Sequence, residues 1–308
     1  MRNCIQFEID GQWLRGVCHE PPGVSGDPES GRTGVLFGNS GWLPRSGRGD
    51  LSVHLADAQA QDGYWAFRFD MPGLGDSDGD LPTESWELLN MIQVGDHGPF
   101  TCWLAGELKK RYGLEKIILA GHCGSAMSAV YAAMLDNSNV VSGLILMDMV
   151  FEAVPRAVLA NGSPGQPAPP LRNFFGKARR LAKRWILKAP GGDKLKTLYR
   201  QSIRASEKFR GLDVPANSNT KLMEAWRRVM DKRLPTLIIS AHHPAAGGKF
   251  DYLAYLKVEQ QPGVTSVAIE GTTHSFLEGN GGQAVLAHCA NWLHEHFPAR
   301  SFASSKKS

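Results

Sequence analysis

The chain has 308 residues, 42% of them hydrophobic and 21% charged, which is typical of a globular protein with a large core. No stretch approaches the roughly 18 uninterrupted apolar residues of a transmembrane helix, and the N-terminus lacks the apolar region of a signal peptide. These absences lead us to predict a cytoplasmic protein.

The net charge is only +4, but it is distributed unevenly. Residues 151–233 hold 19 of the 34 Lys and Arg residues and only 6 of the 30 acids, a net charge of +13. The remainder, with 15 basic and 24 acidic residues, carries nine net negative charges. We therefore expect a basic module on an acidic body.

Predicted strands and helices alternate along most of the chain. The elements in chain order are a hairpin at 3–18 around an Asp-Gly turn, an apolar run from 34, a helix at 51–62, a strand at 64–70, a helix at 98–112, strands at 116–121, 141–150, 234–240 and 264–271, and a helix at 281–297. Near-continuous apolar strands separated by helices indicate a mostly parallel sheet covered on both faces.

One segment interrupts this alternation with helical patterning. It follows a Pro-rich stretch, NGSPGQPAPP, and the apolar residues of 171–186 fall on one helical face. We predict that 151–233 is a basic helical cap inserted between two parts of one core, 1–150 and 234–300. Residues 301–308 should form a flexible tail.

A cysteine occupies the turn between the strand at 116–121 and the next helix. Gly121-His122-Cys123-Gly124-Ser125 departs by two residues from the G-x-S-x-G nucleophile elbow, a strained strand-to-helix turn that exposes a nucleophile. Cys123 takes the nucleophile position, and Ser125 replaces the last glycine with a residue small enough to fit. The N-terminus of the following helix would favour the thiolate.

The other four cysteines, by contrast, are expected to be structural. The total of five is odd and shows no C-x-x-C spacing, which argues against both a disulfide framework and a zinc site. The four are Cys4, Cys18, Cys102 and Cys289.

Three further motifs accompany this turn: GNSGWLPRSGRGD (38–50), RFDMPGLGDSDG (68–79) and GTTHSF (271–276). Together they resemble the α/β-hydrolase superfamily, and within it the exosortase A system-associated hydrolases of type 1. Cysteine at the elbow is also similar to dienelactone hydrolases and bile-acid-conjugating acyltransferases. The resemblance implies an α/β-hydrolase fold with His274 as general base. It also implies an oxyanion hole from the N-H of Gly124 and one N-H of the loop at 39–42, with Ser40 and Gly41 as candidates.

The acid of the triad is ambiguous, because the usual place after the strand at 234–240 is occupied by His242 and His243. Asp251 follows several residues later, whereas Asp148 ends the preceding strand. We favour Asp148 and keep Asp251 as the alternative. The two adjacent histidines point in different directions and lack a carboxylate cluster, so we expect a loop there and no metal.

These residues predict a hydrolase that cleaves an ester or thioester through an acyl-cysteine intermediate. Two alternatives remain: an acyltransferase that passes the acyl group to an amine or alcohol, and a non-catalytic binding protein of the same fold. The basic cap would attract CoA, a carboxylate substrate or an acidic acyl carrier protein, or else an anionic membrane surface. We expect no cofactor and no nucleic-acid partner.

Overall fold

The computed structural model describes residues 1–23, 32–153, 214–215, 217–242 and 250–299. The chain divides into two compact units, one formed by Met1–Ala153 with Asn219–Ser308 and the other by Val154–Ser218. Almost all of the second unit and the predicted tail at 301–308 lie outside the described residues. The helical patterning predicted for that unit, and its role as a cap, therefore stay predictions.

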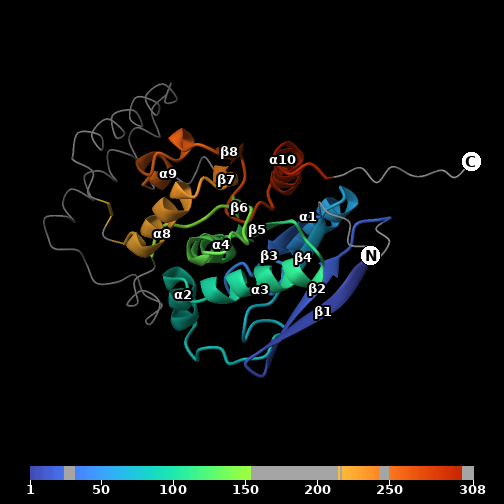
Figure 1. Ribbon diagram of the computed structural model, residues 1–308. Helices are drawn as coiled ribbons and strands as arrows, with labels where there is room; N and C mark the ends of the chain where they lie inside the picture. Colours follow the sequence, from blue (N-terminus) through green and yellow to red (C-terminus); the bar gives the residue numbers. More distant parts are fainter. Residues whose placement is uncertain (24–31, 154–213, 216, 243–249, 300–308) are drawn as a thin grey trace, which may run out of the picture. The chain divides into compact units, whose positions relative to one another are not determined.

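The first unit is built on one eight-stranded sheet (Figure 1) with the order β1-β2-β4-β3-β5-β6-β7-β8. The strands are β1 (Arg2–Ile9), β2 (Gln12–His19), β3 (Thr33–Phe37), β4 (Trp65–Phe69), β5 (Lys116–His122), β6 (Gly143–Met147), β7 (Thr236–His242) and β8 (Val264–Glu270). β1 and β2 form an antiparallel hairpin, β2 pairs antiparallel with β4, and every other pairing is parallel. The predicted hairpin and the mostly parallel sheet are thus confirmed.

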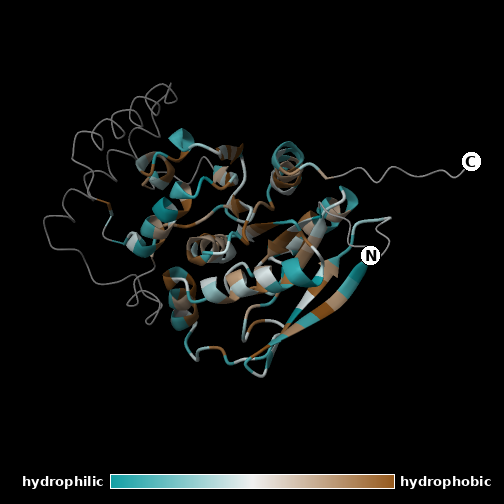
Figure 2. Ribbon diagram, in the orientation of Figure 1, coloured by the Kyte–Doolittle hydropathy of each residue, from teal (hydrophilic) through white to brown (hydrophobic). Residues whose placement is uncertain are grey.

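Helices cover both faces of this sheet, with α1 and α10 on one face and α3, α4 and α8 on the other (Figure 1). The helices are α1 (Leu51–Gln61), α2 (Ser85–Val94), α3 (Gly98–Arg111), α4 (Gly124–Leu135), α8 (Thr220–Asp231), α9 (Tyr252–Tyr255) and α10 (Gly281–His296), with 3₁₀ turns η1 (Arg48–Asp50) and η2 (Val258–Gln260). All five residues of each of β3, β4 and β6 are buried, as two-sided coverage requires. Figure 2 shows by its brown colour that the strands at the centre of the sheet are largely hydrophobic. None of the helices in the described part of the chain combines the length and hydropathy needed to cross a membrane.

Helix α8 lies in the first unit, although its residues fall within the cap predicted at 151–233. Its apolar face, which includes the buried Leu222 and Trp226, packs against α4. Lys232, just beyond α8, donates to the carbonyl oxygens of Ala133 (2.6 Å) and Asp136 (2.5 Å) at the C-terminal end of α4. A cation at that end offsets the negative pole of the helix dipole. The basic residues of α8 therefore belong to the first unit. The second unit, Val154–Ser218, by itself contains 14 Lys and Arg residues against three acids.

Candidate active site

The turn that carries Cys123 has the strained backbone expected of an elbow. Cys123 lies between β5 and α4 with φ 57° and ψ −111°, a conformation that a non-glycine residue adopts only when its surroundings enforce it. Its N-H donates to the carbonyl of Met147 at 3.0 Å, which ties the turn to the end of β6. The side chain of Cys123 is partly exposed.

Two glycines of the turn are required by close backbone approach. A Cβ on Gly121 would lie 2.3 Å from the carbonyl carbon of Ser125, and a Cβ on Gly124 would lie 2.9 Å from the nitrogen of Gly41. Both contacts are with backbone atoms, which cannot rotate out of the way. The sequence motif therefore reflects packing of β5, α4 and the loop at 39–42 against one another.

Gly121→Ala is expected to destabilise the protein by about 3 kcal/mol or more, because the added methyl group would overlap the first turn of α4. The matched control is Gly106→Ala in α3, where nothing lies within 4 Å of the new Cβ. That variant should gain up to about 1 kcal/mol from helix propensity. Urea unfolding followed by circular dichroism measures both, and equal stabilities of the two variants would contradict the tight elbow.

Ser125, in the place of the last glycine of the motif, closes the turn with its hydroxyl group. Its Oγ accepts from the N-H of His122 at 2.9 Å and donates to the carbonyl of His122 at 3.0 Å. A hydroxyl group can make both bonds at once because it is donor and acceptor together. The departure from glycine therefore adds two hydrogen bonds to the elbow.

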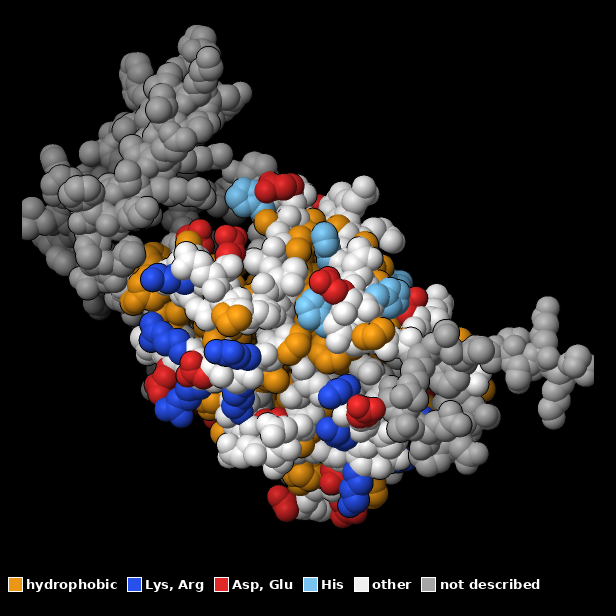
Figure 3. Space-filling model, turned by 45° about the horizontal axis from the view of Figure 1, so that its top comes forward, with side chains coloured by type: hydrophobic (Ala, Val, Ile, Leu, Met, Phe, Trp, Pro, Cys, Tyr) orange, Lys and Arg blue, Asp and Glu red, His pale blue; other side chains and the backbone are white. Residues whose placement is uncertain are grey.

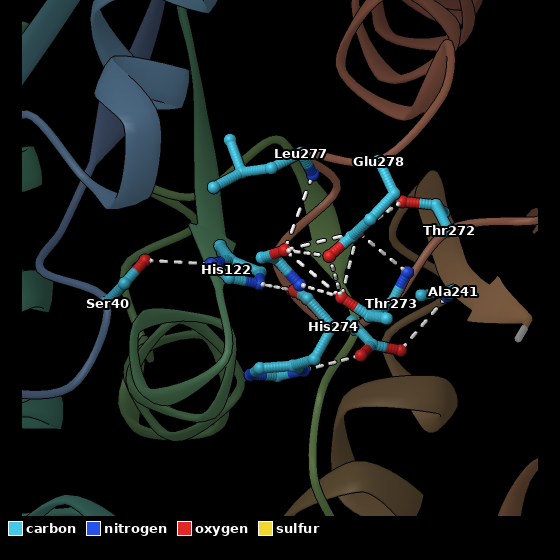
Figure 4. Close-up of polar contacts among 10 residues, drawn as sticks. Ser40, His122, Ala241, Thr272, Thr273, His274, Leu277 and Glu278 are labelled. Carbon is cyan, nitrogen blue, oxygen red and sulfur yellow. Dashed lines mark hydrogen bonds and ion pairs between the residues drawn. The ribbon is translucent and has the colours of Figure 1, made fainter. Parts of the chain in front are cut away.

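His274, labelled in Figure 4, and Asp148 come together at the carboxyl ends of the strands. His274 lies in the loop after β8, and its Nδ1 is 2.5 Å from Oδ2 of Asp148. The other carboxylate oxygen of Asp148 accepts from the N-H of Ala241 at 3.1 Å. Asp251 is elsewhere, since its side chain accepts from the N-H of Ala254 and caps α9. The structure thus places Asp148, and not Asp251, against the histidine.

These contacts shift the ionisation of both groups. The pKa of His274 is raised to about 9, first by the carboxylate of Asp148 and then by the side chain of Cys123 beside it. Burial pushes the pKa of Asp148 upward, but the hydrogen bonds from His274 and Ala241 outweigh it and hold that pKa below its ordinary value. At neutral pH the pair is therefore an imidazolium and a carboxylate, beside the side chain of Cys123.

The loop at 39–42 lies against the start of α4. The backbone nitrogen of Gly41 approaches Gly124. Within the described chain, the N-H of Gly41 donates no hydrogen bond. Gly124 is the first residue of α4, so its N-H has no acceptor inside the helix. Ser40 directs its hydroxyl group to Nδ1 of His122 at 3.1 Å. Among the described residues, the N-H groups of Gly41 and Gly124 thus have no acceptor, and the Gly41 nitrogen lies against Gly124, the residue after Cys123.

A buried aspartate anchors this loop. Asp70, fully buried at the end of β4, accepts from the side chain of Asn39 at 2.8 Å and the N-H of Arg45 at 2.7 Å, and forms an ion pair with the Arg45 guanidinium. Asn39 also accepts from the N-H of Met71 at 2.8 Å. Residues of the sequence motifs at 38–50 and 68–79 thus bind one another and together hold the loop at 39–42 in place.

His122 is the residue of this region to which the sequence analysis assigned no role. It occupies the variable position of the elbow motif, is 4% exposed, and contacts both Ser40 and the backbone of His274. Its position directly before the candidate nucleophile was the one feature of the sequence that pointed to a role in the site. Its partners could not be identified because Ser40 and His274 are 82 and 152 residues away.

The remaining cysteines and the side chain of His242 make no contact with Cys123, His274 or Asp148 in the described part of the chain. Cys18 and Cys289 are buried, and burial raises the pKa of each thiol to about 12. His242 ends β7 at 3.8 Å from Glu270, and His243 lies outside the described residues. In the part of the chain that the structure describes, no group of three metal-ligating side chains gathers. On the face of the molecule that Figure 3 shows, histidine side chains lie among hydrophobic, basic and acidic ones.

Comparisons with known proteins agree on the fold. A model described as the alpha/beta hydrolase family matches residues 30–288. The solved structure of DcsB in complex with its substrate analogue is 14% identical, covers 96% of this chain and 100% of that chain, and has a TM-score of 0.58. Est1E from Butyrivibrio proteoclasticus with bound ferulic acid is 16% identical (95% and 98% covered, TM-score 0.54), and dienelactone hydrolase from Anabaena variabilis is 13% identical (96% and 98%, 0.54). The chain matches no curated protein.

Proposed function

Because this chain belongs to the alpha/beta hydrolase family and is an enzyme of that fold, we propose that it cleaves an ester or thioester through a covalent acyl group on Cys123. In this proposal His274 is the acid and base, Asp148 orients it, and the N-H groups of Gly124 and Gly41 form the oxyanion hole. The observation that carries the proposal is a cysteine on a strained elbow beside a histidine that a carboxylate holds in place.

The reaction follows from these positions. The Cys123 thiolate attacks the carbonyl carbon, and the oxygen, which gains the negative charge, accepts hydrogen bonds from the two N-H groups. The bond to the leaving group breaks as His274 donates its Nε2 proton to that group. A water molecule then gives a proton to His274 as it attacks the acyl carbon, the carbon–sulfur bond breaks, and the acid leaves with the thiolate restored.

The protonated state of His274 supports cysteine in place of serine. An imidazolium beside the sulfur favours the thiolate, and the same proton serves the leaving group. A serine would need a neutral base to remove its proton, and the carboxylate of Asp148, the largest cause of the raised His274 pKa, favours the protonated base whichever nucleophile stands at 123. The chemistry of the base and that of the nucleophile therefore match.

The acyl donor that we propose is anionic, such as CoA or an acidic acyl carrier protein. The support is charge: Val154–Ser218 holds 14 basic and three acidic residues, and Arg48 is an exposed cation whose field contributes to lowering the pKa of His122. If an amine or alcohol replaced water as the acceptor, the same acyl-enzyme would make the protein an acyltransferase. The resemblance to exosortase A system-associated hydrolases favours water.

Intact-protein mass spectrometry tests the covalent step. Brief exposure to p-nitrophenyl esters and to acyl-CoA should add one acyl group to the wild type and to Cys102→Ala, a matched control for a partly exposed thiol in α3. Cys123→Ala should acquire none. His274→Ala should retain the acyl group longer, because it lacks the base for water attack.

An acyl group on a cysteine other than Cys123 would overturn the assignment. If no donor labels Cys123 and iodoacetamide alkylates it no faster than free cysteine, the non-catalytic binding protein becomes the better interpretation. Screening amines, alcohols and water for loss of the adduct then separates a hydrolase from an acyltransferase.

A further inference from the structure

His122 makes hydrogen bonds to both loops that flank Cys123 (Figure 4). Its Nε2 lies 2.7 Å from the carbonyl oxygen of His274, and its Nδ1 lies 3.1 Å from Oγ of Ser40. The His122 ring is also 4.8 Å, centroid to centroid, from the ring of His274 and 5.7 Å from that of Phe276. One buried side chain thus spans from the loop of the proposed base to the loop of the proposed oxyanion hole.

The partners determine the tautomer of His122. A carbonyl oxygen only accepts, so Nε2 must carry the proton that lies between it and His274. Burial first, and then the charges of His274 and Arg48, lower the pKa of His122 to about 4, while the carbonyl of His274 and the charge of Asp148 act in the opposite direction. The ring is therefore neutral at neutral pH, Nδ1 is an acceptor, and the Ser40 hydroxyl group must donate to it.

This arrangement positions atoms on both sides of Cys123. Holding the carbonyl of His274 sets the backbone from which its imidazole reaches Asp148 and the Cys123 sulfur. Holding the Ser40 hydroxyl group sets the residue directly before Gly41, whose N-H lies against Gly124. A neutral ring does so without a second positive charge beside the imidazolium of His274.

We propose that His122 is a positioning residue of this enzyme. With its proton fixed on Nε2, it holds the loop of His274 (the base loop) and the loop at 39–42 (the oxyanion loop) in place on either side of Cys123. The inference rests on the proposed function, because it assumes that those two loops serve one reaction. His122 itself does not touch the reacting atoms in this account.

Three substitutions separate the two hydrogen bonds. His122→Phe keeps a ring of similar size but removes both, His122→Gln can keep the donor to the His274 carbonyl, and Ser40→Ala removes only the bond to the oxyanion loop. We expect kcat to fall roughly 100-fold in His122→Phe and roughly 10-fold in Ser40→Ala, with KM changed less than about threefold. The kcat of His122→Gln should lie close to that of Ser40→Ala, because the glutamine keeps the hydrogen bond to the His274 carbonyl.

The alkylation rate of Cys123 by iodoacetamide, measured against pH, reports the thiolate–imidazolium pair independently of turnover. Its profile should be unchanged in Ser40→Ala and His122→Gln, and displaced in His122→Phe, where the base loop loses its anchor. If His122 had a purely structural role, the variants would be less stable, but the pH profile of alkylation would not differ between His122→Phe and the other two variants. Wild-type kcat and alkylation in His122→Phe would overturn the proposal.

Nitrogen-15 NMR of histidine-labelled wild type tests the tautomer directly and needs no variant to fold. The His122 signals, assigned by their loss in His122→Gln, should show a neutral ring with the proton on Nε2 throughout pH 6 to 8. A charged ring or a proton on Nδ1 would refute the positioning role. If the tautomer is found but no donor acylates Cys123, the proposed function has failed and the hydrogen-bond assignment has not.

Discussion

Replacing Cys123 with alanine is expected to lower kcat for ester cleavage by roughly 10⁴- to 10⁶-fold, the range found when a covalent nucleophile is removed. The loss has a direct cause, since no other described thiol lies beside His274. Steady-state hydrolysis of a p-nitrophenyl ester measures it, with circular dichroism to show that the variant folds. Activity within tenfold of the wild type would eliminate Cys123 as the nucleophile.

Cys123→Ser is the matched variant, because it keeps the shape of the elbow and changes only the nucleophilic atom. It should be at least about 100-fold slower at neutral pH, since an alcohol ionises far less readily than a thiol. The pH dependence should also differ in sign. Wild-type kcat/KM should fall as pH rises through about 9, where the imidazolium of His274 is lost, whereas the serine variant needs a neutral His274 and should gain activity with rising pH.

Asp148→Asn should lower kcat by about 10- to 1000-fold and move the descending limb of the pH profile toward lower pH. The carboxylate of Asp148 is the largest contribution that raises the pKa of His274 from 6.5 to about 9, so its loss returns that pKa toward the ordinary value. An asparagine that keeps the hydrogen bond from Ala241 would also present its amide N-H₂ to His274 and favour the wrong tautomer. The effect should be smaller than in a serine enzyme, because a thiol depends less on its base.

Asp251→Asn is the control for Asp148→Asn. Its side chain caps α9 through the N-H of Ala254, a bond that asparagine can also make. We expect kcat and the pH profile of this variant to match the wild type within about twofold. If instead Asp251→Asn lost activity and Asp148→Asn kept it, the acid would have to be reassigned and the loop of His274 would have to move.

The sequence by itself determined the features that depend on local pattern. Alternating strands and helices indicated a mostly parallel sheet because fully buried strands are continuously apolar. The elbow at Cys123 was readable because its glycines are required by close backbone approach within a few residues, and His274 was readable because its motif follows the last strand. The concentration of basic residues in 151–233 was visible in the composition alone.

Only the tertiary structure decided which distant groups meet. Asp148 and Asp251 were both available in sequence, and the contact of Asp148 with a histidine 126 residues away follows from where the carboxyl ends of β6 and β8 lie. Likewise, the apolar face of α8 required a partner, but that this partner is α4 is a property of the folded chain. The tautomer of His122 depends on a carbonyl and a hydroxyl group from two other loops. Hydrogen-bond partners this far apart in the chain leave no periodic signal, because they are set by the spatial order of the strands.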